Sequence, residues 1–481
     1  MAPLVLVLDQ GGHSSRALVF DAAGTVVAQA REAVATHYLS VEQIEQNPHE
    51  IVQSLRDVVA AVSVQLGECC GEIVAAALIV QRSSVVALDE ISGMPLSPIL
   101  SWQDTRNANW LAEIGRDAQS GLRQLTGLRV NAHYGASKMR WLLDNMQVLQ
   151  QAVEENTLCI TPLAGFLCRH LTDASQTVVD AVIASRTLLT AISALHWSSI
   201  LLDFFTIPEN ILPSICATLA DYGEITVGDV KVPLRLLGGD QSFFMLSHGK
   251  RFDDSAIFIN AGTGAFVQQS MPAVDVPSSL LAAPLVIAKS AQDSVIVAEG
   301  TVNAAATALD WWWQQSGVVF SDEDWCAADA ESAQSTAQVP VFINRVTALG
   351  SPDWLPAGES YFTQNAAPIS LKTIAVLEAI VFALQRNIDL LATVKPCQVI
   401  VISGGLSKLD VFCQRIADLS GKTVTRSDDA EACARGAAAQ LLSSVVAQQN
   451  YQIFSPAERM GLHQRYQQWT ALMNQLSADV G

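Results

Sequence analysis

Two glycine-rich turns in the sequence follow β-prone apolar runs, and turns of this type can bind phosphate. Gly11-Gly12 comes shortly after residues 4–8, and Gly262-Thr263-Gly264 comes shortly after residues 256–260. Because glycine has no Cβ atom, the backbone N–H groups of such a turn can approach an anion and converge on it. One such turn is often a simple tight hairpin, but two in matching positions of two halves could hold a polyphosphate from both sides.

Two aspartates have positions that suit phosphoryl transfer. Asp9 follows the first apolar run, where it could hold Mg²⁺ through water molecules or merely cap the following turn. Asp240 follows Gly238 and Gly239 at the predicted start of a helix. It could be an N-cap stabilised by the helix dipole, or a base that orients a substrate hydroxyl toward the γ-phosphate. The residues alone leave both alternatives open for each aspartate.

Groups that suit a polyol site follow another apolar run. Arg82 and Ser83 come just after the predicted strand 73–80, where the arginine could bind sugar hydroxyls or lie on the surface. Residues 101–106 read SWQDTR, which places the ring of Trp102 near the carboxylate of Asp104. A polyol pocket needs an aromatic face and a few polar groups that fix orientation. The structural alternative is a buried tryptophan beside a surface Asp–Arg pair.

Other common catalytic motifs are missing from the sequence. It contains no GxxxxGK(S/T), which excludes a P-loop enzyme, and no GxGxxG after a predicted strand, which disfavours a dinucleotide site. It also has no HExxH and no clustered His/Cys set of the kind that binds a catalytic metal.

The elements that would position these residues are strands, tight turns and helices. A meander of antiparallel strands is predicted for residues 4–8, 17–20 and 25–28. Helical periodicity then covers residues 48–66, with Asn47 as the expected N-cap and Pro48 in the first turn. The continuous apolar run 73–80 predicts a buried strand.

The second part of the chain repeats this arrangement. The predicted elements are strands at 234–237, 256–260, 265–269 and 398–402, a glycine turn at 238–239 and an alanine-rich helix at 430–443. The last of these strands is closed by Gly404 and Gly405. Since each half opens with a strand, a glycine turn and a strand, we expect two domains, residues 1–239 and 240–481.

The composition limits the partners of the chain. Its 481 residues, half of them hydrophobic, suffice for about two to four domains. A net charge of −19 repels nucleic acid and anionic membranes, so neither is an expected partner. The nine cysteines include no CxxC pair, which favours reduced thiols in a reducing compartment.

Targeting signals are also missing from the sequence. The first residues lack the basic region of a signal peptide. The uncharged run 187–202 has 16 residues, fewer than the about 20 that a membrane span needs, and it predicts buried core structure. We therefore expect a cytoplasmic protein.

As a set, the motifs resemble the FGGY carbohydrate kinases, most closely the glycerol-kinase branch of that family. LVLDQGGHSSRALVFD (6–21) is similar to the first phosphate motif, DxGTTSxR between two strands, and INAGTGAF (259–266) to the second, NxGTGxF. QRSSVV (81–86) and SWQDTRNA (101–108) are similar to the substrate segment, and GGDQ (238–241) to the catalytic GDQ. Further similar stretches are SKMRWLLDN, ASRTLL, IPENILPSI, AEGTVNAAATALDWW, ALGSPDWLP, ISGGLSKLDVF and ACARGAAAQLL. Their order and spacing hold over nearly the whole chain.

The resemblance implies an α/β fold of two ribonuclease-H/actin-like domains, with ATP and substrate in an interdomain active-site cleft. It implies transfer of the γ-phosphoryl group of ATP to a hydroxyl of a small sugar or polyol. Mg²⁺ would be bound at Asp9 and Asp240 through water. The N-terminal domain would hold the substrate and the first phosphate loop, and the C-terminal domain the nucleotide. Dimers are common in the family, so a homodimer stays an open alternative.

The resemblance also assigns roles to individual residues. Asp240 matches the catalytic base. The nucleotide-binding positions are Asp9, Gly11, Gly12, His13, Ser14, Arg16, Gly262, Thr263, Gly264, Ala306, Gly404 and Gly405. The substrate-binding positions are Arg82, Ser83, Trp102, Asp104, His133, Asp240, Gln241 and Phe266.

Several positions depart from the family pattern. Gly12 and His13 replace two threonines of the first loop, and His13 could supply a phosphate contact of its own or be a tolerated replacement. Ser83 replaces a glutamate of the glycerol kinases and His133 a tyrosine, whereas Asp104 is similar to the WxDxR pattern of ketose kinases. A pentulose, another ketose, a tetritol and a glycerol-like polyol therefore stay open as acceptors.

Two other functions compete with the kinase. One is a nucleotide-binding protein of this fold with weak or no turnover, acting as a regulator, which the altered first loop would favour. The other is an ATPase without a small-molecule acceptor, which would not need the cluster around Arg82 and Trp102.

Overall fold

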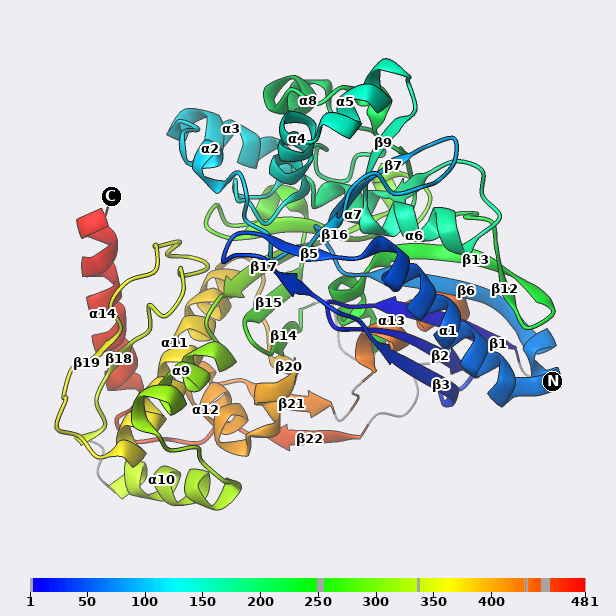
Figure 1. Ribbon diagram of the computed structural model, residues 1–481. Helices are drawn as coiled ribbons and strands as arrows, with labels where there is room; N and C mark the ends of the chain where they lie inside the picture. Colours follow the sequence, from blue (N-terminus) through cyan, green and yellow to red (C-terminus); the bar gives the residue numbers. More distant parts are fainter. Residues whose placement is uncertain are drawn as a thin grey trace. The chain divides into compact units, whose positions relative to one another are not determined.

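The computed structural model describes residues 3–248, 255–334, 338–427, 429, 431–442 and 450–480. By their contacts, the residues group into two compact units, each built from three stretches of chain. Unit 1 contains Met1–Arg251, Ala282–Ile296 and Glu431–Gln448, and unit 2 contains Phe252–Leu281, Val297–Ala430 and Gln449–Gly481. Each unit combines helices with a central β-sheet, which confirms the α/β class (Figure 1).

The central sheet of unit 1 has six strands in the order β12-β13-β6-β1-β2-β3. Its strands are β1 (Leu4–Gln10), β2 (Ser14–Phe20), β3 (Val26–Ala33), β6 (Ile73–Val80), β12 (Glu224–Val227) and β13 (Val230–Gly239). β1, β6 and β13 run parallel, and the other strands are antiparallel to their neighbours. All residues of β1 are buried, because this strand lies inside the sheet.

The sequence predicted the first elements of this unit well. α1 (Pro48–Leu66) and β6 have the predicted bounds, and the Asn47 side chain caps α1 by accepting a hydrogen bond from the His49 N–H group. β2 begins at Ser14 rather than at Ala17, because its pairing with β3 starts at Ser14. Apolar patterning could not detect this extension, since Ser14, Ser15 and Arg16 are polar.

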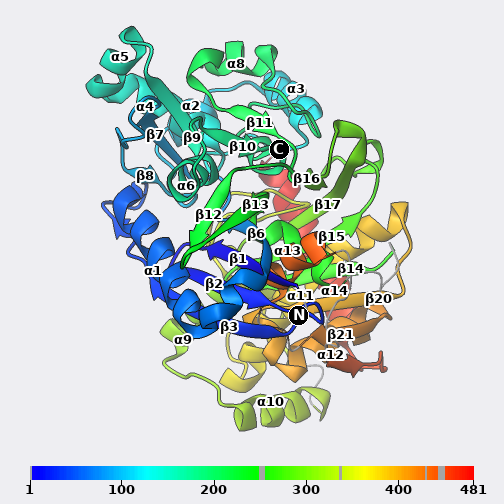
Figure 2. The ribbon, with the colours of Figure 1, turned by 90° about the vertical axis from the view of Figure 1, so that its right-hand side faces the viewer.

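A helix from the end of the chain packs on this sheet. The helix predicted at 430–443 corresponds to α13 (Ala432–Leu442), while Ala430 and Ser443 lie outside the described residues. α13 lies beside β1 and β6 (Figure 2). Its residues Ala434 and Ala437 share an apolar cluster with residues of these strands. Unit 1 therefore depends on residues more than 400 positions apart.

The rest of unit 1 consists of two smaller sheets and several helices. The sheets have the orders β4-β5-β8-β7-β9 and β10-β11. The bounds are β4 (His37–Tyr38), β5 (Ile44–Gln46), β7 (Val85–Asp89), β8 (Ile99–Leu100), β9 (Leu158–Pro162), β10 (Val178–Asp180), β11 (Ser214–Cys216), α2 (Ala108–Ala112), α3 (Arg116–Thr126), α4 (Gly135–Asn145), α5 (Gln147–Glu154), α6 (Leu163–Leu171), α7 (Ala181–Ser185) and α8 (Ser199–Phe205). The sequence predicted that the run 187–202 is buried. This prediction is wrong for part of the run, because Ile200 at the start of α8 is 65% exposed.

The strands of unit 2 follow the order β17-β15-β14-β20-β21-β22. Its elements are β14 (Ile257–Ala261), β15 (Ala265–Ser270), β17 (Ser294–Val302), β18 (Phe342–Ile343), β19 (Tyr361–Phe362), β20 (Val399–Ser403), β21 (Thr423–Ser427), β22 (Tyr451–Phe454), α9 (Ala306–Ser316), α10 (Asp322–Gln334), α11 (Ile369–Val394), α12 (Asp410–Ser420) and α14 (Leu462–Val480). Two of the points at which the chain passes from one unit to the other fall within β16 (Leu281–Ile287) and β17. The predicted hairpin 256–260/265–269 and the strand 398–402 are confirmed to within one residue.

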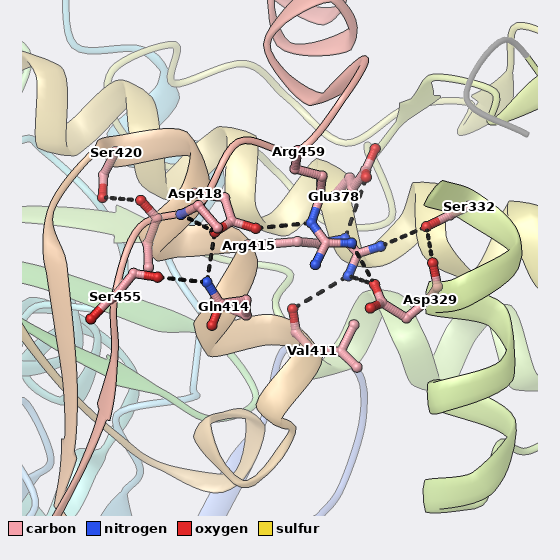
Figure 3. Close-up of polar contacts among 12 residues, drawn as sticks. Asp329, Ser332, Glu378, Val411, Gln414, Arg415, Asp418, Ser420, Ser455 and Arg459 are labelled. Carbon is pink, nitrogen blue, oxygen red and sulfur yellow. Dashed lines mark hydrogen bonds and ion pairs between the residues drawn. The ribbon is translucent and has the colours of Figure 1, made fainter. Parts of the chain in front are cut away.

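A largely buried network of ion pairs joins four helices and a loop of unit 2; Figure 3 shows its part around Arg415. The fully buried Arg415 of α12 lies 2.5 Å from the Asp329 carboxylate of α10 and 3.3 Å from the Glu378 carboxylate of α11. Arg465 of α14 donates two hydrogen bonds of 2.6 Å to the same Glu378. The network contains Arg415, Arg459 and Arg465 with Asp329, Glu378 and Asp418. Its charges balance, which is the condition under which charges tolerate burial.

Among the helices formed by the described residues, none is long and apolar enough to cross a membrane.

Candidate active site

Three parallel strands of unit 1 end at the same edge of the sheet. Gln10 of β1 and Gly239 of β13 lie on opposite sides of Val80 in β6. The segments that leave this edge carry three predicted site residues, Asp9, Arg82 and Asp240. Open α/β sheets bind ligands outside the carboxyl ends of their strands, so this edge is the candidate active site of unit 1.

Asp240 is the first residue of a 3₁₀ turn, η3 (Asp240–Phe243), and its Oδ1 accepts a hydrogen bond of 2.7 Å from the Gln241 N–H group. The Arg82 side chain lies directly over Gly239, where a Cβ atom would come within 2.7 Å of Arg82 Cγ. Burial raises the pKa of the Asp240 carboxyl from 3.8 to about 6. The positive charge of Arg82 lowers this pKa, and the negative charge of Asp9 raises it. A carboxylate with this pKa can accept a proton near neutral pH.

Asp9 lies opposite Arg16 in the β1–β2 pair, and its carboxylate forms an ion pair with the Arg16 guanidinium. This contact differs from the turn-capping alternative of the sequence analysis. Arg16 also lies 2.5 Å from the Glu431 carboxylate, just before α13. Burial raises the pKa of Asp9, and Arg16 opposes that rise. Sequence reasoning missed Glu431, because nothing in the local pattern links it to a strand 415 residues away.

A chain of glutamines holds the first glycine turn. The Gly12 carbonyl accepts hydrogen bonds of 3.0 Å from Thr36 Oγ1 and from Gln46 Nε2. Gln81 Nε2 donates in turn to Gln46 Oε1 at 2.8 Å and to Gln10 Oε1 at 3.0 Å. The sequence analysis gave these glutamines no role. They fix the turn relative to the ends of β1 and β6, which a phosphate-binding turn requires.

The side chain of His13 is exposed next to this turn, and its carbonyl accepts a hydrogen bond of 3.0 Å from Val34 N–H. Ser14 closes the turn, because its carbonyl accepts a hydrogen bond of 3.0 Å from Gly11 N–H. The first loop is therefore an ordered hairpin turn that presents His13 outward.

Trp102 and His133 form an aromatic pair near this edge. Their ring centroids are 5.6 Å apart, and Trp102 is 37% exposed. The Trp102 N–H group donates a hydrogen bond of 2.9 Å to Ser84 Oγ, which ties the tryptophan loop to the segment after β6. A Cβ atom on Gly12 would lie 3.7 Å from Trp102 Nε1. The tryptophan therefore lies beside the first glycine turn with part of its ring open to solvent.

The His133 imidazole is held in its neutral form. Burial lowers its pKa well below 6.5, and the charges of Lys138, Arg186 and Arg82 lower that pKa further. His133 can therefore donate or accept a hydrogen bond through its ring nitrogens, but it adds no positive charge of its own.

Asp104 does not fit the predicted direct contact with a substrate. It is completely buried, and its carboxylate accepts a hydrogen bond of 2.8 Å from Ile44 N–H and is bound by the Arg106 guanidinium at 2.7 Å. The structural alternative is reversed as well, because the Asp–Arg pair is buried and the tryptophan is partly exposed. Asp104 holds the loop that carries Trp102.

Three buried polar atoms beside the site have no hydrogen-bond partner among the described residues: Gln81 Oε1, Ser83 Oγ and Ser242 Oγ. Ser83 is only 2% exposed and has φ = 67°, a left-handed conformation that non-glycine residues rarely adopt. Unpaired buried polar groups and strained backbone concentrate at functional sites. They are groups that a bound ligand could satisfy.

Unit 2 brings together its own set of predicted residues. Gly262 N–H donates to the Gly264 carbonyl at 2.8 Å, and the Ala306 N–H group at the start of α9 donates to the Gly262 carbonyl at 3.1 Å. Gly404 has φ = 93°, and a Cβ atom there would collide with the Ala261 carbonyl, so only glycine fits this close approach. The second glycine turn and the Gly404 turn therefore lie at adjacent strand ends.

The predicted site residues thus fall into two sets. Unit 1 carries Asp9, Gly11, Gly12, His13, Ser14, Arg16, Arg82, Ser83, Trp102, Asp104, His133, Asp240 and Gln241. Unit 2 carries Gly262, Thr263, Gly264, Phe266, Ala306, Gly404 and Gly405. Phe266 of β15 is half-buried opposite Asn260 of β14. Their functional roles stay predictions.

The carboxylates at the edge of unit 1 suit magnesium. Over the described ranges, no group of three or more His, Cys, Asp or Glu side chains could enclose a metal ion. Mg²⁺ does not need such an enclosure, since it is usually bound by one or two carboxylates, several waters and substrate phosphates. Asp9 and Asp240, close enough for each charge to act on the other, supply such a set.

Comparisons with known proteins cover nearly the whole chain. Residues 4–246 match the family model of the FGGY family of carbohydrate kinases, N-terminal domain, and residues 257–444 match that of the C-terminal domain. A glycerol kinase of Natranaerobius thermophilus is 28% identical over 451 residues, which cover 91% of this chain and 89% of that protein.

Two solved structures share the fold. The crystal structure of Plasmodium falciparum glycerol kinase with ADP has a TM-score of 0.85 and 20% identity, and it covers 99% of this chain and 98% of that one. The gluconate kinase from Lactobacillus acidophilus has a TM-score of 0.85 and 18% identity, with 99% of each chain covered. At these identities the likeness concerns the fold, which matches the expected two-domain architecture.

Proposed function

The chain belongs to the FGGY family of carbohydrate kinases, and we propose that it transfers the γ-phosphoryl group of ATP to a hydroxyl group of a small sugar or polyol. Family membership makes it a phosphotransferase with an alcohol group as acceptor. The observation that supports specific residues is the position of Asp240, with a pKa raised to about 6, beside Arg82 and Asp9. These groups can bind a hydroxyl, orient it and take its proton.

In the proposed mechanism, the Asp240 carboxylate accepts a hydrogen bond from the acceptor hydroxyl. The hydroxyl oxygen then forms a bond to the γ-phosphorus, and its proton passes to the Asp240 carboxylate. The bond between the γ-phosphorus and the bridging oxygen breaks, and ADP leaves with that electron pair. Phosphoryl transfer needs mainly positioning and charge stabilisation, so the carboxylate takes the proton late.

The other residues bind and orient. Arg82 and the open face of Trp102 would hold the acceptor, while Asp104 keeps the tryptophan loop in place. Gly262, Thr263 and Gly264 would bind phosphate through their backbone. Mg²⁺, held through water by Asp9 and Asp240, would neutralise charge on the β- and γ-phosphates.

The proposal includes a division of labour between domains. Residues 1–239 would bind the acceptor and hold the first phosphate loop, and residues 240–481 would bind the nucleotide. The interdomain cleft, the homodimer and the cytoplasmic location stay predictions. The acceptor could be a pentulose, another ketose or a glycerol-like polyol.

The first test measures ADP release with ATP and Mg²⁺ across a panel of polyols, ketoses and aldoses. We expect release that depends on one class of acceptor. Equal release without any acceptor would identify an ATPase instead. Nucleotide binding without release would identify the regulator that the sequence left as an alternative.

The second test replaces the proposed base. We expect Asp240→Asn to lower kcat by about 10²–10⁴-fold with little change in ATP affinity, because proton acceptance and orientation are lost while the nucleotide contacts remain. Asp229→Asn, at an exposed turn of the same unit, is the matched control and should keep full activity. Unchanged turnover in Asp240→Asn would remove Asp240 from its role.

A further inference from the structure

Charge is distributed unevenly along the acceptor side of unit 1, which we define as Arg82, Ser83, Trp102, His133 and Asp240. One end carries the carboxylates of Asp240 and Asp9. The Arg82 side chain starts over Gly239, next to Asp240, and its charge acts both on Asp240 and on His133. The charge of Arg82 therefore reaches both the acidic end and the His133 end.

Two basic side chains, Lys138 and Arg186, lie at the His133 end; burial lowers the pKa of Lys138 to about 7, so near neutral pH the lysine is only partly charged. Lys138 Nζ donates hydrogen bonds of 2.5 Å to the His133 carbonyl and 2.9 Å to the Ala132 carbonyl, and Lys138 is completely buried. The Arg186 guanidinium lies 5.5 Å from the ring centroid of Tyr134, and that ring lies 5.3 Å from the ring centroid of His133. The depressed pKa of His133 agrees with this geometry.

A carboxylate at this end, that of Asp104, is already bound by protein groups. The negative charge of Asp104 raises the pKa of Lys138, but the Asp104 carboxylate is fully buried and is bound by Arg106 and by the Ile44 N–H group. It therefore cannot reach a ligand. An acceptor that extends from Asp240 along Arg82 would place its far end in a positive field.

Ser83 offers a hydrogen-bond donor for such an end. Its hydroxyl is buried without a partner among the described residues, and its backbone has a left-handed φ of 67°. Gln81 Oε1, two residues earlier, is also buried without a partner in that part of the chain. Ser83 follows Arg82 directly in the sequence, and a hydroxyl and a guanidinium that both reach a ligand can bind one carboxylate together.

We propose that the acceptor is an acidic polyol, a polyhydroxy acid whose carboxylate is bound by Arg82 and Ser83 near His133 while its reacting hydroxyl lies at Asp240. This inference rests on the proposed kinase function and narrows its acceptor. The overall charge of −19 gives the protein no general attraction for anions, so only a local cluster could select one. The likeness to a gluconate kinase, at 18% identity, carries no weight in this argument.

Matched acceptors test the proposal on the intact protein. ADP release is measured with glycerol against glycerate, erythritol against erythronate, and ribitol against ribonate, which differ only in the charged terminal group. We expect kcat/KM to be at least about tenfold higher for the acid in at least one pair. The proposal is overturned if the neutral member is preferred in every pair, or if only ketoses react. If no acceptor of any class releases ADP, the kinase function itself fails.

A pair of variants tests the assigned carboxylate site. Ser83→Asp places a negative charge there, and Ser83→Asn is the neutral control of equal size; both residues tolerate a left-handed φ. We expect the Asp variant to lose about 100-fold or more in kcat/KM for the acid relative to the Asn variant, and the loss for the neutral partner to be at least about tenfold smaller. Equal acid preference in the two variants would contradict the assignment.

Binding provides a readout that does not depend on turnover. Calorimetry measures the affinity of the preferred acid for the wild-type protein and for Arg82→Gln. We expect Arg82→Gln to weaken binding of the acid at least about tenfold more than binding of the matched alcohol, because both would contact Arg82 but only the acid carries an opposite charge. Equal losses for acid and alcohol would show that Arg82 does not recognise the carboxylate.

Discussion

At the scale of single residues, Asp240 has two opposed requirements. A base must be ionised near neutral pH, yet burial favours its neutral form and raises its pKa from 3.8 to about 6. The carboxyl therefore stabilises the fold fully below pH of about 4, and this contribution is lost as pH rises through about 6. The difference between the pKa values of 3.8 and about 6 corresponds to a loss of at most about 3 kcal/mol of folding stability at pH 8.

Replacing the base should consequently stabilise the protein at high pH. We expect Asp240→Asn to raise the free energy of unfolding by about 1–3 kcal/mol at pH 8 and by much less at pH 4, because asparagine cannot ionise. Urea unfolding at the two pH values measures this. A variant that is equally or less stable than the wild type at pH 8 would contradict the assignment.

The same pKa sets the acid limb of activity. Since the ionised carboxylate is the active form, kcat/KM should fall as pH drops through about 6. Arg82 lowers the Asp240 pKa, so Arg82→Gln should move this limb to higher pH, in addition to weakening acceptor binding. Arg235→Gln, an exposed arginine on β13, should leave the limb in place. A limb that does not move in Arg82→Gln would show that another group controls it.

Residue patterns identified part of this site and missed another part for a physical reason. Asp9, Arg82 and Asp240 each follow a buried strand, and parallel strands bring such positions to one edge. Glu431 reaches Arg16 only through the packing of α13, which no local pattern encodes. The burial of Asp104 could not be predicted, because burial depends on tertiary packing and not on the identity of sequence neighbours.

At the scale of elements, α13 positions the catalytic turn. Gly436 of α13 faces η3, and a Cβ atom at this glycine would collide with the Phe243 carbonyl. Gly436→Ala should therefore push η3 and Asp240 away, lowering kcat and reducing stability by about 1–3 kcal/mol. Gly121→Ala, inside α3 with open space around it, is the control and should be neutral or slightly stabilising. Activity assays and urea unfolding of both variants test this, and equal behaviour would exclude a close contact.

The buried ion-pair network gives the helices of unit 2 their mutual positions. Glu378→Gln would leave Arg415 and Arg465 short of negative charge inside the protein, so it should destabilise by about 3–5 kcal/mol. Asp221→Asn breaks the exposed pair with Arg235 and should change stability by less than about 1 kcal/mol. Denaturant unfolding compares the two. Loss of α14 docking should also expose the C-terminal helix to proteases in the Glu378 variant.

Elements with a clear periodic pattern were predictable, whereas uncharged runs were not. α1 and β6 match their predicted bounds because their apolar residues repeat at the period of a helix and as a continuous buried strand. The run 187–202 lacks charge but also lacks a period, and it is partly exposed. Lack of charge alone therefore does not predict burial.

At the scale of the whole molecule, the order of residues along the chain differs from their grouping in space. The duplicated motifs indicated a division at Gly239, which stays a proposal about function. The compact units instead combine distant stretches, since unit 1 takes in Ala282–Ile296 and Glu431–Gln448. Thr218, for example, receives a hydrogen bond from Ile287 N–H at 3.1 Å within this unit.

This grouping predicts that the N-terminal part cannot fold alone. A fragment of residues 1–251 lacks α13, which covers the apolar cluster containing Val5, Val7 and Ile79. Exposing three such side chains costs about 1.5–3 kcal/mol each, comparable with the whole net stability of a domain, about 5–15 kcal/mol. We expect the fragment to lack cooperative unfolding and near-ultraviolet circular dichroism, and co-expression with residues 252–481 to restore both.

In the control, Ala434→Asp and Ala437→Asp in the second fragment should prevent rescue, since both alanines are buried in the same cluster. Cooperative unfolding of the isolated fragment would show that α13 is dispensable, because the sheet would then be stable with its apolar face uncovered.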